Sequence, residues 1–117
     1  MNNSELTALG WGKTPGPPYY VAIFTSQRIG VDADFGVMVE RMSEVAQKQP
    51  GFLGMDSAEG GDGIGIVVSY WEDGESIRRW KLHLEHLQAQ KLGREHWFKR
   101  YQVRVGRVER AYGFEIE

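Results

Sequence analysis

Hydrophobic and polar side chains alternate along four stretches of the chain in the manner of β-strands. Three of them, residues 19–27, 52–58 and 64–71, are rich in β-branched and aromatic residues. The glycine-rich run at 60–63 is a turn signal between the second and the third stretch. A fourth stretch, residues 101–114, alternates until its phase slips at Gly106-Arg107, which predicts a β-bulge there.

Two other stretches repeat their hydrophobic residues every three or four positions, which is typical of amphipathic helices. The first covers residues 35–46 and is stopped by the Pro-Gly pair at 50–51. The second opens after Asp73, where acidic side chains favour a helix N-terminus. Its hydrophobic stripe consists of Ile77, Trp80, Leu84 and Leu87.

The order of these elements, strand-helix-strand-strand-helix-strand, is the split βαβ arrangement of a ferredoxin-like α+β fold. Such a fold is a four-stranded antiparallel sheet with both helices on one face. We expect residues 19–117 to form this single domain. Residues 1–18 are rich in glycine, proline and small polar side chains, and we expect them to form an irregular arm.

The helix-free face of such a sheet has consequences for assembly. The register that we favour places Tyr20, Phe24, Val67 and Trp71 on it, and a shift by one residue would place the opposite set there. Large hydrophobic groups lie on both faces in either register, and an uncovered hydrophobic face usually marks an interface. We therefore expect two copies to pair through their sheet faces and to close a dimeric α+β barrel.

Composition makes several functions improbable. The chain has 14 basic and 16 acidic side chains, a formal net charge of −2, which gives no reason to expect nucleic acid or a membrane as partner. Cysteine is absent, which excludes disulfides, thiolate nucleophiles and cysteine-ligated metals. No hydrophobic run has the length of a membrane span and no signal-peptide pattern is present, so a cytoplasmic protein is expected.

An ordered set of short motifs resembles the antibiotic biosynthesis monooxygenase superfamily. The set consists of Pro50-Gly51-Phe52, Ser69-Tyr70-Trp71-Glu72, Trp80 with His83, Glu85-His86, Ala89-Gln90 and Gly93-Arg94, followed by Trp97, Tyr101 and Val108-Glu109-Arg110. The resemblance implies a dimeric α+β barrel with a pocket between helices and sheet in each subunit. That superfamily contains cofactor-independent monooxygenases of polyketide quinols, heme-degrading monooxygenases and members without known activity. It therefore implies either no cofactor or, as the alternative, heme.

The second helix carries the candidate catalytic residues, His83 and His86. Together with Gln90 they fall in one sector of the helix beside its hydrophobic stripe. Two imidazoles placed in this way can act as a general base, or bind a metal or heme iron. The commoner arrangement is that such histidines lie at the helix edge and hydrogen-bond to water or to a partner. In the heme-degrading relatives that the chain resembles, the position of Gln90 is taken by the ligand histidine.

Aromatic side chains supply the walls of a candidate ring-binding pocket. In a cofactor-independent oxygenase the substrate provides the electrons, and the protein provides a dry aromatic pocket and a base. The expected substrate-binding residues are Phe24, Tyr70, Trp71, Trp80, Gln90, Arg94 and Trp97. Each aromatic taken alone is also explained by core packing.

The leading interpretation is a metal-free monooxygenase of a small aromatic molecule, such as a quinol or a polyketide-like compound. Two alternatives stay open. One is a heme-binding or heme-degrading monooxygenase, and the other is a non-catalytic dimer that binds a small-molecule ligand.

Overall fold

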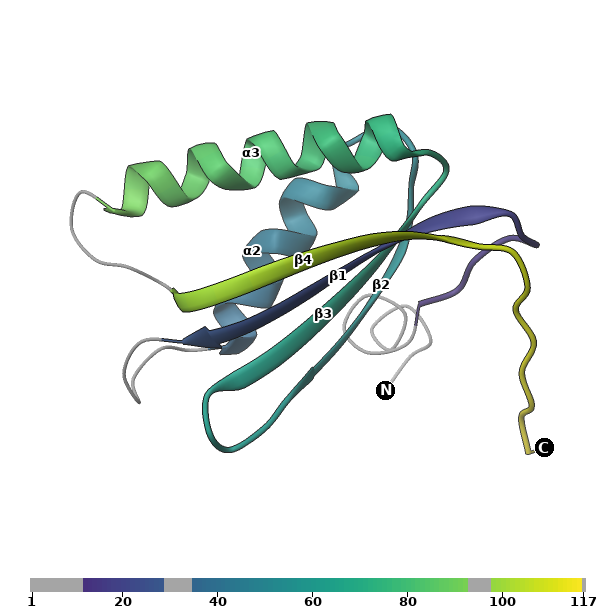
Figure 1. Ribbon diagram of the computed structural model, residues 1–117, viewed down its shortest axis with the longest axis horizontal. Helices are drawn as coiled ribbons and strands as arrows, with labels where there is room; N and C mark the ends of the chain where they lie inside the picture. The colour runs from purple at the N-terminus through teal and green to yellow at the C-terminus, as the bar shows by residue number, and fades with distance from the viewer. Residues whose placement is uncertain (1–11, 29–34, 93–97, 117) are drawn as a thin grey trace.

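The computed structural model describes residues 12–28, 35–92 and 98–116, with the backbone only at 35–38 and 86–92. Six elements follow in the predicted order: β1 (Tyr19–Arg28), α2 (Phe35–Gln47), β2 (Phe52–Glu59), β3 (Ile64–Trp71), α3 (Gly74–Leu92) and β4 (Phe98–Val108). The strands form one antiparallel sheet in the order β2-β3-β1-β4. Both helices cover the same face of this sheet (Figure 1), which confirms the ferredoxin-like α+β fold.

The hydrophobic core lies between the two helices and the sheet face that they cover. The helices contribute every third or fourth residue and the strands every second one, as the two periodicities require. The buried cluster contains Val39, Met42 and Ala46 of α2, Ile77, Trp80 and Leu84 of α3, and Ala22, Phe24, Met55, Val67 and Trp71 of the strands. In the described part of the chain, no helix is long and apolar enough to cross a membrane.

The helix-free face carries the opposite set from the one that the sequence favoured. Phe24, Val67 and Trp71 are buried beneath the helices, and Tyr20 packs against the same core. Large aromatic side chains lose the most water-exposed apolar area when helices cover them, so this register is the more stable one. The middle of the helix-free face holds smaller residues, among them Val21, Ile23, Thr25, Ile66 and Val68, and Tyr19 and Tyr70 lie at one end of it.

Strand β4 begins and ends earlier than predicted, and the predicted bulge is wrong. Its pairing with β1 continues without a break across Gly106 and Arg107, and the irregularity lies at the other end, between Gln27 and Arg28. The hydrophobic residues of β4 change face without any inserted residue. Val105 lies on the helix-bearing side opposite Ala22, whereas Val108 lies on the other side, opposite Tyr19. Residues 109–116 follow β4 and are not part of a strand.

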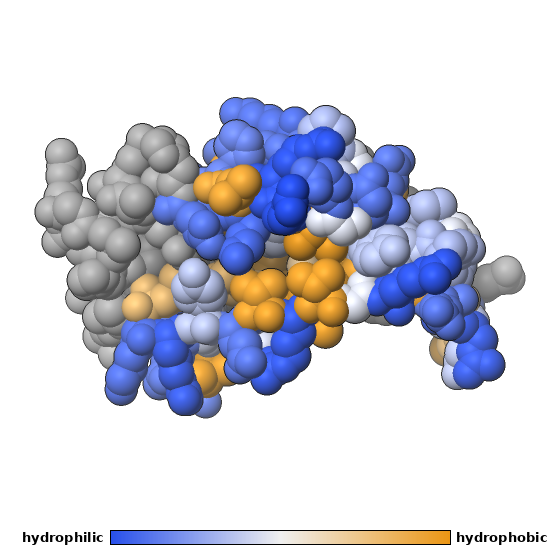
Figure 2. All heavy atoms as spheres, turned by 45° about the horizontal axis from the view of Figure 1, so that its top comes forward, coloured by the Kyte–Doolittle hydropathy of each residue, from blue (hydrophilic) through white to orange (hydrophobic). Residues whose placement is uncertain are grey.

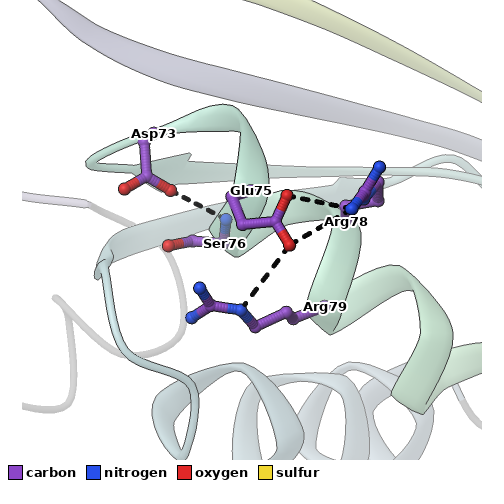
Figure 3. Close-up of polar contacts among 5 residues, drawn as sticks. All are labelled: Asp73, Glu75, Ser76, Arg78 and Arg79. Atoms are coloured by element: carbon purple, nitrogen blue, oxygen red, sulfur yellow. Dashed lines mark hydrogen bonds and ion pairs between the residues drawn. The ribbon is translucent and has the colours of Figure 1, made fainter.

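Helix α3 starts directly after Asp73, as predicted, and Asp73 caps it. Asp73 Oδ1 accepts a hydrogen bond from the backbone N–H of Ser76 at 2.8 Å, as in an N-cap (Figure 3). This bond favours the ionised carboxylate and lowers the pKa of Asp73 below its ordinary value of 3.8. On the exposed side of the first turn, Glu75 pairs with Arg78 at 3.1 Å and with Arg79 at 3.9 Å.

The turn between α2 and β2 packs directly against the start of α3. Gly51 has a φ of +88°, a conformation that glycine adopts without strain. A Cβ atom at Gly51 would collide with the Ser76 side chain, and the Gly51 carbonyl accepts a hydrogen bond from the N–H of Glu72 at 2.8 Å. The end of one helix–strand connection and the beginning of α3 therefore form one tightly packed unit.

The described part of the N-terminal arm lies on the helix-free face near β2. The backbone N–H of Gly12 donates to Asp56 Oδ1, and the hydroxyl of Tyr70 donates to Asp56 Oδ2 at 2.6 Å. A Cβ atom at Gly54 would touch the backbone of Lys13, so the absence of a side chain on β2 lets the arm approach closely. Residues 12–13 of the arm are thus anchored to the sheet.

Candidate functional site

A hydrophobic recess lies between α3 and the outer half of the sheet. On the helix-bearing side of β4, Tyr101 and Val105 remain 43% and 56% exposed, although they share a face with the buried core. Figure 2 shows hydrophobic surface gathered between α3 and β4. The floor beside them is Ala22 and Phe24 of β1, both buried. Tyr101 stacks on Phe24 with a centroid distance of 5.0 Å, so the rim of the recess is a flat aromatic surface.

An aromatic cluster lies under α3 on the same face of the sheet. The rings of Trp71 and Trp80 are 5.2 Å apart, and Phe52 packs edge-on against Trp71 at 5.3 Å. Trp71 and Trp80 are 0% and 2% exposed, yet the indole N–H of each has no hydrogen-bond partner among the described residues. Nearly all buried donors in proteins are paired, and an unpaired one costs about 1–3 kcal/mol. The same buried cluster therefore contains two unpaired donors, which requires an explanation.

Three of the predicted substrate-binding residues come together, and one lies elsewhere. Phe24, Trp71 and Trp80 belong to a single buried cluster. Tyr70, by contrast, lies on the helix-free face, where its hydroxyl donates to Asp56 and its ring meets Tyr19 at 5.9 Å. Burial and the Asp56 hydrogen bond raise the pKa of Tyr70 above its ordinary value of 10.0. Tyr70 therefore holds the arm and the sheet together and does not line the recess.

The candidate catalytic histidines lie on α3. His83 is exposed and stands about 75° around the helix axis from the middle of the buried stripe. The side chains of His86 and Gln90, and all of Arg94 and Trp97, lie outside the described residues. Their assignment to catalysis and substrate binding stays a prediction.

The buried interior of the described part offers no proton acceptor of its own. Its buried polar side chains are the serines 26, 43, 69 and 76. A serine hydroxyl does not take up a proton near neutral pH, so a general base must come from the edge of the recess. Among the described side chains His83 is the histidine available for this role, and it is exposed on α3.

The described buried face of α3 contains no ligand for heme iron. Between residues 76 and 85 the buried positions are Ser76, Ile77, Trp80 and Leu84, none of which is an axial ligand of heme iron. No group of three or more metal-ligating side chains is found among the residues that the structure describes. Gln90, which stands where the heme-degrading relatives have their ligand, lies outside the described side chains.

A second concavity, of about 250 Å³, lies toward one end of β1 and β4, and most of its lining residues have polar side chains. Its lining comes mostly from the helix-free face and includes Thr25, Gln27, Ile64, Arg100, Gln102 and Arg104. Arg100 donates to Gln27 at 3.1 Å, and Arg104 donates to Gln102 at 3.2 Å. These polar pairs suit a wet interface better than an aromatic ring, so the recess under α3 is the candidate site.

Two residues of that recess were missed from the sequence, namely Tyr101 as a stacking surface and Val105 as its open rim. The signal was present, because both alternate in phase along the last strand. What the sequence does not show is that the helices leave β4 uncovered. That depends on where each helix crosses the sheet.

Comparisons with known proteins agree with this fold. Residues 18–92 match the family described as antibiotic biosynthesis monooxygenase. The uncharacterized protein YqjZ of Bacillus subtilis is 46% identical over 103 residues, which cover 88% of this chain and 90% of YqjZ.

Solved structures give the same answer for the fold. A variant of SnoaB, a cofactor-independent oxygenase from Streptomyces nogalater, superposes with a TM-score of 0.63 at 16% identity, covering 80% of this chain and 95% of that one. NE2512 of Nitrosomonas europaea, a protein of unknown function, has a TM-score of 0.59 at 12% identity, covering 88% of this chain and 99% of its own. The match over 18–92 and the identity to YqjZ together show that the chain belongs to the antibiotic biosynthesis monooxygenase family.

Proposed function

We propose that the chain is a cofactor-independent monooxygenase that binds a small aromatic molecule, of the quinol or polyketide class, in the recess between α3 and β4. The observation that carries the proposal is the pair of unpartnered indole N–H groups on Trp71 and Trp80. Buried donors without an acceptor among the described residues suit a ligand that brings an oxygen acceptor on an aromatic frame; because neither N–H is exposed to solvent, such a ligand must displace part of the core to reach them. SnoaB, which shares the fold, is itself described as a cofactor-independent oxygenase.

The chemistry asks little of the protein. For a substrate of the anthrone class, a base removes a proton and leaves an electron-rich carbanion whose charge is shared with the ring oxygen. That carbanion gives its electrons to dioxygen. One oxygen atom ends as the new carbonyl on the methylene carbon, and the other leaves with the two methylene hydrogens as water. An N–H donor to the charged ring oxygen, in a site that excludes water, would lower the barrier to the first step.

His83 is the proposed base. A neutral imidazole is suited to accept a proton near pH 7, and its place at the edge of the buried stripe would let it meet the rim of a bound ring. The catalytic role predicted for His86 is kept as part of the proposal.

A homodimer formed through the helix-free sheet faces is part of the proposal. Ile66 is 41% exposed on that face, next to Val68 and Ile23 in the adjoining rows. A second copy that covers these residues would remove them from water and close the barrel.

Oxygen uptake with a panel of anthrones and naphthoquinols tests the proposed function. We expect consumption of one dioxygen per anthrone, a fall of about tenfold or more in His83→Ala, and little change in the control Leu82→Ala, whose side chain is 60% exposed on the same helix. No turnover by any member of the panel, or equal rates for the two variants, would contradict it.

Two further readouts separate the alternatives. A Soret shift on titration with micromolar heme would support the heme-binding alternative instead. Tight binding of an anthrone without oxygen uptake, unaffected by loss of both histidines, would support the non-catalytic ligand-binding dimer.

A further inference from the structure

Two arginines border the polar concavity on the helix-free face of the sheet. Arg100 and Arg104 lie on β4 with Gln102 between them, and all three side chains belong to the same face of the strand. They line the concavity of about 250 Å³ toward one end of β1 and β4. The recess under α3 lies on the other face of the sheet, so the concavity is separate from the proposed oxygenase site.

Each of the two guanidinium groups is held by an uncharged partner. Arg100 Nε donates to Gln27 Oε1 at 3.1 Å, and Arg104 Nη2 donates to Gln102 Oε1 at 3.2 Å. A glutamine oxygen directs an arginine without cancelling its charge, because the amide group is neutral. The ion pairs among the described residues involve other side chains and leave Arg100 and Arg104 without a carboxylate. Two positive charges therefore remain at one concavity.

The rest of the described lining is rich in hydrogen-bond donors and contains no acidic side chain. Gln27 and Gln102 accept through their oxygens, so the NH₂ group of each amide is available to donate. Thr25 adds a hydroxyl, and Ile64 adds an apolar wall. The carboxylate of Asp62, two residues before Ile64, is engaged in the hairpin, where its Oδ1 accepts from the Ile64 N–H at 3.0 Å. Several donors and two uncompensated cations are the chemistry of an anion site.

The spacing of the arginines suits a ligand with more than one anionic oxygen group. Four strand residues at about 3.3 Å each separate the two Cα atoms by roughly 13 Å. Arg104 reaches toward Gln102, and thus toward Arg100, which brings the guanidinium groups closer than their backbones. A guanidinium group offers parallel N–H donors that match the oxygens of a phosphate or a carboxylate. One small molecule can therefore meet both arginines within the concavity.

We infer that this concavity binds a small oxyanion, a molecule with phosphate or carboxylate groups, between Arg100 and Arg104. The inference goes beyond the proposed oxygenase function and does not depend on it. In the proposed homodimer a second copy would cover this face, and guanidinium groups removed from water without a counter-charge are costly. A bound anion supplies that counter-charge.

Equilibrium dialysis of the full-length protein against labelled pyrophosphate and, separately, labelled succinate tests the site. We expect a dissociation constant of about 0.1 mM or lower for the better probe at low ionic strength. The probe that binds more tightly identifies the group, phosphate or carboxylate, that the site prefers. Retention of neither probe at about 1 mM would overturn the inference, whether or not the protein consumes oxygen.

Three arginine variants of the same strand locate the binding. Arg100→Gln and Arg104→Gln should each weaken binding of the better probe by about tenfold or more, and the double variant by about a hundredfold. Arg107→Gln is the matched control, because Arg107 is an exposed arginine of β4 that lies on the opposite face. The control should change the dissociation constant by less than about twofold. Equal losses in Arg107→Gln and Arg100→Gln would show a general charge effect and would overturn the site.

Discussion

Replacing Trp80 by Phe separates a structural from a ligand-binding role of the buried indole. Trp80 is 2% exposed, packs 5.2 Å from Trp71, and has an indole N–H without a partner among the described residues. The phenyl ring leaves about 35 Å³ less side chain in the core, which costs about 1 kcal/mol at ~24 cal/mol per Å³. Removing an unpaired buried donor returns about 1–3 kcal/mol. The free energy of unfolding should therefore change by no more than about 2 kcal/mol in either direction.

The effect on the ligand should be larger than the effect on stability. If the Trp80 N–H donates to an oxygen of the bound aromatic molecule, its loss should weaken anthrone affinity or turnover by about 10- to 100-fold. Met42→Ala is the control, because Met42 is 2% exposed in the same core but belongs to α2 and has no hydrogen-bonding group of this kind. It should lose about 2–5 kcal/mol of stability while the folded fraction keeps normal affinity.

Urea unfolding followed by circular dichroism measures stability without relying on the indole that is removed. Anthrone titration and oxygen uptake measure the ligand. A loss above about 3 kcal/mol in Trp80→Phe with unchanged affinity would refute the reasoning, because the N–H would then have a partner within the folded protein and no role in binding.

Three other outcomes are expected. Asp73→Ala should lower the melting temperature by a few degrees at neutral pH, because it removes the cap of α3. The pKa of Asp73 is lowered in the folded state, so the cap stabilises the protein above pH 3.8 and this stabilisation disappears as the pH falls below that value. Equal differences in Tm between the two proteins at pH 7 and at pH 2 would contradict this. Burial and the Asp56 hydrogen bond raise the pKa of Tyr70, so the protein should lose stability as the pH rises above 10.0. In an ultraviolet titration, Asp56→Asn should move one tyrosinate transition to lower pH. An unchanged transition would show that burial alone raises the pKa of Tyr70. If the proposed sheet-face homodimer forms, Ile66→Glu should dissociate it in light scattering. Leu82→Glu, which replaces an exposed hydrophobic residue on α3, should not.

The order of elements was predictable because each element is locally consistent. The hydrophobic period of two or of three to four, the Asp73 cap and the Pro-Gly stop at 50–51 all depend on neighbours in the sequence. The face on which the helices lie was not predictable, because β1 and β3 carry hydrophobic residues on both sides. In the structure Phe24 lies in the core with Trp71 and Trp80, whereas Ile66 is exposed on the other face.

The end of β4 was mispredicted for a related reason. Tyr112 and Phe114 continue the alternation of the last strand, so the sequence predicts a strand that runs on to them. β1 pairs with β4 only up to the Tyr19–Val108 pair, and beyond that point no strand of the described residues lies beside the chain. Alternation thus identified a segment with the pattern of a strand, but not whether a neighbouring strand would lie beside it.

The candidate site was half-predictable. The sequence marked Trp71 and Trp80 as ring-binding residues, and the structure brings them into contact. Tyr70 precedes Trp71 in the chain and was predicted to bind the ring with it. Neighbouring residues of a strand point to opposite faces, so Tyr70 lies on the other side of the sheet. The unpaired indole donors were beyond sequence reasoning, since pairing depends on every surrounding acceptor.

The close fit of Gly51 against Ser76 bears on how proteins of this kind can change over evolutionary time. The hairpin at 60–63 is exposed, so an insertion there would be absorbed at the surface. A single methyl group at 51 has nowhere to go except into the opening turn of α3, and Trp80 lies one turn further along that helix. A side chain at position 51 should therefore shift the start of α3 and change the geometry of the recess beneath it. Position 51 is thus a sensitive place to look for family members whose recess binds a different ligand.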